Sequence, residues 1–109
     1  MIKVAGYAQK TYVDQGVDTA PATGGGATIY AGAGANAAQF RMVKNASQTG
    51  GATPIAYYTY SGIDPTSANG IPLYDGDFVE IYENELSTIK IASADANTCT
   101  IHWILWFLK

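Results

Sequence analysis

Turn-forming dipeptides divide the segment from Pro54 to Glu83 into short pieces. The close spacing of these turns constrains the fold more than any other feature of the sequence. The dipeptides are Asp64-Pro65, Asn69-Gly70 and Asp75-Gly76. Asn-Gly and Asp-Gly favour tight turns because their residues tolerate positive φ. No window of about 11–18 residues has the periodicity of an amphipathic helix. Short strands between closely spaced turns are typical of an all-β sandwich or barrel.

Alternating polar and apolar residues mark the strands between the turns. We expect strands at residues 39–45, 53–60, 77–83, 86–92 and 98–108. In the last strand, one side would carry Ile101, Trp103, Leu105 and Phe107, and the other His102, Ile104, Trp106 and Leu108. Both sides are apolar, so the core should cover one and an N-terminal arm or another subunit the other. The predicted fold is a small, jelly-roll-like antiparallel β-sandwich.

The N-terminal third has a different character. Residues 1–14 contain a weak strand candidate, and residues 15–38 are rich in Gly and Ala and nearly free of charge. The run Gly24-Gly25-Gly26 is unfavourable inside a regular element, and it lacks the GxxxxGK[ST] pattern of a phosphate-binding loop. We therefore expect a single domain with a strand and extended Gly/Ala-rich arm at residues 1–38 and a β-sandwich core at residues 39–109.

Composition excludes several functional classes. Charged residues make up only 14% of the chain, against roughly 25% in average domains, which suits a protein packed against neighbours. The six basic residues are scattered, so direct nucleic-acid binding is not expected. One Cys and one His exclude a Cys/His metal site. No stretch approaches the ~18–20 apolar residues of a membrane span, and the N-terminus lacks the apolar core of a signal peptide.

No catalytic or cofactor-binding constellation is evident. His102 has no local nucleophile or carboxylate partner and is expected to be a packed or hydrogen-bonded structural residue. Cys99 is expected to be a small buried hydrophobe. An acidic group could in principle bind calcium or hydrolyse glycosides, but its spacing matches no calcium loop and it flanks a turn. This group is Asp75, Asp77, Glu80, Glu83 and Glu85.

Aromatic residues are the candidates for an interface. They are Tyr57, Tyr58, Tyr60, Tyr74, Trp103 and Trp106. A tyrosine-rich patch can stack on sugar rings, which makes a carbohydrate-binding module one hypothesis. The same composition suits protein–protein interfaces, where Tyr and Trp are enriched and charge is depleted. The low charge of the chain favours the interface.

The order of several pieces resembles a pattern in small structural proteins of tailed bacteriophages. The pieces are MVKNAS (42–47), PIAYYTYSG (54–62), SANGIPLYDGD (67–77), FVEIY (78–82), LSTIKIA (86–92) and CTIHWILWF (99–107). The resemblance covers about the last two-thirds of the chain, and residues 1–40 have no counterpart. It implies a non-enzymatic β-sandwich assembled in many copies on a virion, as a head decoration, head-fibre or tail-associated subunit. It brings no catalytic or ligand residues with it.

The resemblance, together with the low charge and the two apolar sides of the last strand, leads us to expect a capsid decoration (auxiliary head) protein that is assembled in the host cytoplasm and stabilises the phage head. Its expected partners are further copies of itself, as a trimer or another cyclic oligomer, and the major capsid protein or another virion protein. The alternative is a carbohydrate-binding or host-adhesion module of a phage tail, with several of the tyrosines exposed on one surface. A small enzyme would need a cleft that brings His102 to a carboxylate or hydroxyl group.

Overall fold

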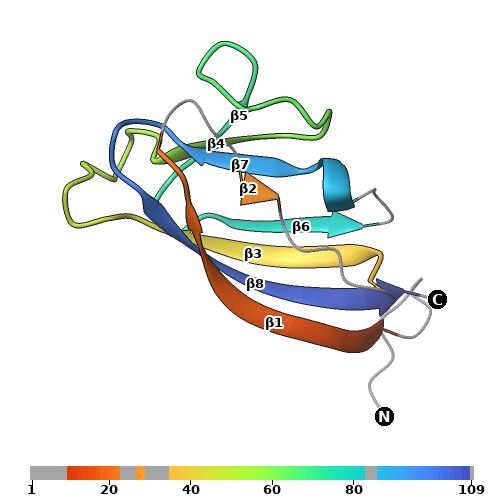
Figure 1. Cartoon of the computed structure of the whole chain (residues 1–109). Helices are drawn as coiled ribbons and strands as arrows, with labels where there is room; N and C mark the ends of the chain where they lie inside the picture. Colours follow the sequence, from red (N-terminus) through yellow and green to blue (C-terminus); the bar gives the residue numbers. More distant parts are fainter. Residues whose placement is uncertain (1–9, 23–26, 29–34, 83–85, 109) are drawn as a thin grey trace.

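The described part of the chain forms two antiparallel sheets that pack on each other (Figure 1). The computed structural model describes residues 10–22, 27–28, 35–82 and 86–108. Within them, sheet A has the strand order β1 (Lys10–Ala20), β8 (Cys99–Leu108), β3 (Ala37–Val43) and β6 (Phe78–Tyr82). Sheet B has the order β2 (Ala27–Thr28), β7 (Lys90–Ser93), β4 (Ala56–Thr59) and β5 (Ile71–Leu73). The expected all-β sandwich is confirmed.

Alternation along the strands decides which side chains enter the core. Phe40 and Met42 of β3 are buried between the sheets, as are Leu105 of β8 and Ile91 of β7. The Phe40 ring meets the ring of Tyr58 edge-on, with centroids 6.1 Å apart. Burying a side chain of this size contributes about 1.5–3 kcal/mol. The core therefore holds the two sheets together through residues that alternate with exposed ones.

Strand β1 was not anticipated from the sequence. It pairs with β8 along its whole length, from Lys10 opposite Leu108 to Ala20 opposite Cys99, with an irregularity between Tyr12 and Asp14. Asp14, Gln15 and Gly16 in its middle favour strands poorly, but hydrogen bonding to the long apolar strand β8 outweighs this local preference. The sandwich thus includes part of the expected arm, because residues 15–20 continue β1 and residues 27–28 pair with β7. The Gly24-Gly25-Gly26 run and most of the first strand candidate lie outside the described residues.

Two further elements differ from the expected strands. Leu86–Thr88 forms a turn of 3₁₀ helix, and β7 begins only at Lys90. Leu86 and Ile89 are both buried, and a spacing of three places residues on one side of a 3₁₀ turn. Strand β5 carries Pro72 and lies at the edge of sheet B, where a missing N–H is tolerated.

Turns form at the Asn-Gly and Asp-Gly dipeptides, although the two glycines have different roles. Gly76 of the Asp-Gly turn has φ +83°. Gly70 of the Asn-Gly turn instead allows close packing, because a Cβ there would lie 2.6 Å from the Cβ of Tyr57. The turn after β3 is fixed by the buried side chain of Gln48. Its Nε2 donates to the Ile55 carbonyl at 3.0 Å, and its Oε1 accepts from the Asn45 N–H at 3.0 Å.

Candidate functional site: the outer face of sheet A

The face of sheet A that points away from sheet B carries a row of exposed side chains. The strand register places Phe78 of β6, Arg41 of β3, His102 of β8 and Val17 of β1 side by side. All four are exposed. They alternate with core residues such as Phe40, so they lie on the opposite side of the sheet. We call this side the outer face.

A second row lies next to the first along the strands. It consists of Glu80, Gln39, Ile104 and Gln15, again from β6, β3, β8 and β1. Gln39 uses both ends of its amide: Nε2 donates to Glu80 Oε2 at 2.8 Å, and Oε1 accepts from the Trp106 indole N–H at 2.7 Å. These bonds fix the orientation of the amide and hold Trp106 against the sheet.

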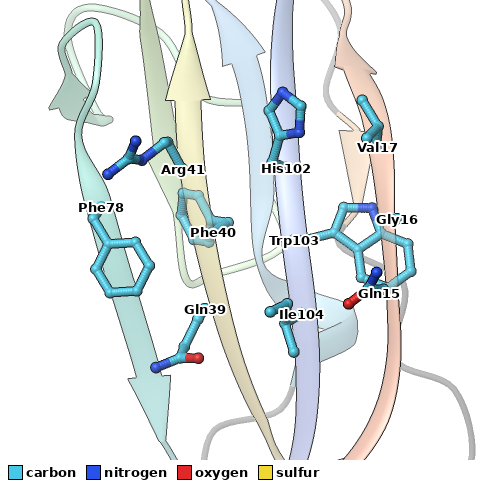
Figure 2. Close-up of a pocket in the computed structure, with 10 residues that line it drawn as sticks. All are labelled: Gln15, Gly16, Val17, Gln39, Phe40, Arg41, Phe78, His102, Trp103 and Ile104. Carbon is cyan, nitrogen blue, oxygen red and sulfur yellow. The ribbon is translucent and has the colours of Figure 1, made fainter.

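The two rows border a shallow cavity of about 460 Å³, which we call the groove (Figure 2). Its lining residues are Gln15, Gly16, Val17, Gln39, Phe40, Arg41, Phe78, His102, Trp103 and Ile104. They come from the four strands of sheet A, so the groove runs across the strands. Figure 2 shows Phe78 and Val17 at its two ends, with Arg41 and His102 between them.

The Trp103 indole reaches from β8 to β1 beside Gly16. A Cβ on Gly16 would lie 2.5 Å from Trp103 Cζ2, so the indole occupies the space that the glycine leaves open. The indole N–H donates to Asp18 Oδ2 at 3.0 Å. Glycine at position 16 therefore allows a tryptophan to lie against the edge strand.

The positive charge of Arg41 has no counter-charge within the described part of the chain. Its guanidinium makes no hydrogen bond or ion pair with the described residues, and neither does the His102 ring. Across the strands, Arg41 faces His102 on one side and Phe78 on the other. The groove thus offers a cation and an imidazole between apolar flanks, which suits the binding of an anionic group.

His102 is more exposed than the sequence suggested. It was expected to be packed or hydrogen-bonded, but it lies exposed on the outer face. The alternation was correct, but no described segment buries this side of β8 at His102. The direct cross-strand neighbours of His102 are Val17 and Arg41, and neither supplies the hydroxyl or carboxylate that a catalytic histidine needs.

Cys99 is buried, as expected. Burial raises the pKa of its thiol to about 11, and the nearby Asp95 carboxylate adds to the rise. The thiol is therefore protonated near neutral pH and is a poor nucleophile. Its Sγ lies 3.7 Å from the Ile55 carbonyl.

The structure does not gather the predicted aromatic residues on one surface. Tyr58 is buried in the core, where burial first, and then hydrogen bonding with Tyr60, raise the pKa of its hydroxyl to about 12. Tyr60 is exposed, and its ring lies 5.5 Å from that of Tyr58. The remaining four are half-buried, and they are Tyr57, Tyr74, Trp103 and Trp106. Of the two tryptophans, only Trp106 lies on the outer face, where it contacts Tyr12 edge-on at 6.1 Å.

Sequence reasoning missed Arg41, Phe78, Val17 and Gln15 as members of one site. Alternation along residues 77–83 places Phe78 with Glu80, opposite Val79 and Ile81. An aromatic residue on the same side as a charged one was the available signal. The register that brings four distant segments into one row is not visible in any single segment.

The described residues form neither a metal-ligand cluster nor a membrane-spanning helix. They contain no group of three or more His, Cys, Asp or Glu side chains that could hold a metal ion. No helix among them is long and apolar enough to cross a membrane.

Comparison with known proteins adds no relative: no protein-family model, no curated protein and no solved structure matches the chain.

Proposed function

We propose that this chain is a non-enzymatic assembly subunit, namely a capsid decoration protein of a tailed phage that stabilises the head through contacts with its own copies and with the capsid. The observation that carries the proposal is the apolar content of the outer face of sheet A. Tyr12 is 52% exposed, Val17 60% and Phe78 55%. They lie on the face that also bears Ile104 and Trp106. Apolar side chains that are exposed together on one face of a sheet support an interaction site there.

A neighbouring protein would cover this face and replace the water over its aromatic and aliphatic side chains. Tyr12 and Trp106 already contact each other, so little side-chain freedom is lost when a partner packs on them. A subunit that binds only the assembled shell stabilises it by mass action. The low charge of the chain, 14%, limits the number of charges that such an interface would desolvate.

The sugar-binding alternative required several of the four candidate tyrosines on one surface. Tyr60 is exposed, Tyr58 is buried, and Tyr57 and Tyr74 are half-buried. The tyrosine platform is therefore not assembled in the single chain, which favours the assembly function.

Sedimentation of the protein with purified heads of a tailed phage, stripped of their decoration protein, tests the proposal. We expect the wild type to co-sediment, and the double variant Tyr12→Ser/Val17→Ser to bind at least tenfold more weakly. The matched control is Ile63→Ser/Ile71→Ser, which removes two exposed apolar residues outside sheet A and should bind like the wild type. Sedimentation velocity measures self-association in parallel. A chain that stays monomeric at high concentration and binds no heads would refute the proposal.

A further inference from the structure

We propose that the groove binds a carboxylate carried by an extended segment of a partner protein, with apolar residues two positions before and two positions after the acidic residue. This inference rests on the proposed function, since it names the part of a partner that contacts the outer face of sheet A. It assigns each end of the groove and its centre a separate role.

The centre of the groove favours a negatively charged group on the ligand. Arg41 is a permanent cation whose planar guanidinium matches a carboxylate with two parallel hydrogen bonds. Its cross-strand neighbours are His102 and Phe78, so no carboxylate faces it directly. Glu80 belongs to the next row, and its Oε2 accepts from Gln39.

The described carboxylates of the chain are already engaged elsewhere. Each of these carboxylates accepts a hydrogen bond from its own chain. The residues concerned are Asp14, Asp18, Asp64, Asp75, Asp77, Glu80 and Asp95. The net charge is −3, yet the described residues leave Arg41 without an ion pair. This distribution favours a different protein, rather than a second copy, as the source of the carboxylate.

The dimensions of the groove match an extended segment. Neighbouring strands lie about 4.8 Å apart, so Phe78 and Val17 are about 14 Å apart across the sheet, each about 7 Å from the midpoint between Arg41 and His102. In an extended chain, residues two positions apart point to the same side and are separated by about 6.7 Å. A segment lying across the strands therefore places an acidic side chain at the centre and an apolar side chain over each end.

The surroundings of the row support this placement. Phe78 offers an exposed aromatic ring at one end and Val17 an exposed aliphatic side chain at the other. Gln15 and Ile104 border the groove beside them (Figure 2). The Gln15 amide is exposed and is available to bond the backbone of the bound segment. A segment of about five residues spans the row.

The experiment titrates the protein with the peptide acetyl-Leu-Ser-Glu-Ser-Leu-amide and follows ¹H–¹⁵N NMR shifts. We expect shifts confined to β1, β3, β6 and β8. The same peptide with Gln in place of Glu should bind at least tenfold more weakly, because it lacks the charge-assisted hydrogen bonds. Arg41→Gln should weaken binding of the Glu peptide by a similar factor, and Phe78→Ser by about threefold or more. Lys90→Gln, which removes the same charge from sheet B, is the matched control and should leave binding unchanged.

Three results would overturn the inference: equal binding of the Glu and Gln peptides, equal binding by Arg41→Gln and wild type, or binding of free glucuronic acid as tight as that of the peptide. The last result would assign the groove to an acidic sugar. Repeating the head-binding assay with Arg41→Gln separates this inference from the proposed function. If the variant binds heads as well as the wild type, the groove inference fails and the function stands. If the wild type binds the peptide but no heads, the function fails instead.

Discussion

Replacing Gly16 with Ala should destabilise the protein through the Trp103 indole. The added methyl carbon would lie 2.5 Å from Cζ2, 3.0 Å from Cε2 and 3.1 Å from Cη2 of Trp103, well inside the ordinary contact distance of about 3.5–4.0 Å. Gly16 is not among the glycines with positive φ, so alanine fits the backbone. The overlap with the indole is therefore the dominant effect of the substitution.

The expected loss of stability can be worked out from the two ways in which the overlap between the new methyl group and the indole can be relieved. If β1 shifts, overpacking costs about 1–3 kcal/mol. If the indole moves away, the 3.0 Å bond to Asp18 is lost, which costs about 1–2 kcal/mol for an exposed bond to a charged acceptor. Alanine regains roughly 0.5–1 kcal/mol because it is less flexible than glycine in the unfolded chain. We expect a net loss of about 1 kcal/mol in the free energy of unfolding.

Urea unfolding followed by far-ultraviolet circular dichroism measures this loss, and the Trp103→Phe background shows its origin. A phenylalanine ring does not extend to the positions of the indole atoms Cζ2 and Cη2, and Cζ2 makes the shortest contact with position 16. In that background, Gly16→Ala should therefore cost nothing or stabilise the protein slightly. If Gly16→Ala costs the same in both backgrounds, within about 0.5 kcal/mol, the account given for Gly16 is wrong.

Three further predictions concern sites away from the groove. Gln48→Ala should lower the free energy of unfolding by about 2–3 kcal/mol in urea, because its buried amide joins the turn after β3 to Ile55; a loss below about 0.5 kcal/mol would contradict this role. The pKa of Cys99, raised to about 11 in the folded state, favours the protonated thiol, so stability should fall between about pH 9 and pH 11 by up to about 2–3 kcal/mol. Cys99→Ala should lose less stability than wild type over that interval, and equal losses would count against the prediction. Lys90→Gln breaks the exposed 3.1 Å ion pair with Asp64 and should change the thermal midpoint by no more than a few degrees.

Local patterns predicted the strands whose faces differ in polarity. Alternation located β6, and it placed Ile101 and Leu105 on the side of β8 opposite His102; the structure buries these two residues and exposes His102. The Asp75-Gly76 turn also formed where its dipeptide indicated. These features depend on neighbours within a few positions, which a sequence displays directly.

Features that depend on distant partners could not be predicted in this way. Strand β1 contains Asp14, Gln15 and Gly16, which favour strands poorly, and it forms because β8 pairs with it. The groove combines residues from four strands, and a shift of one position in any strand would turn its side chain into the core. Alternation along residues 53–60 places Tyr57 and Tyr58 on opposite faces. The expectation of one tyrosine surface rested on composition and did not take this geometry into account.

The position of β8 in the chain has a consequence for the timing of folding. It lies between β1 and β3 in sheet A yet follows both in sequence, and the bond between Asp18 and Trp103 joins residues 85 positions apart. Closing loops of this length makes folding slow relative to helical proteins of similar size. During translation, β1 and β3 have no common neighbour until β8 leaves the ribosome. A nascent chain therefore lacks the groove, and we expect partner binding to wait until β8 has been synthesised.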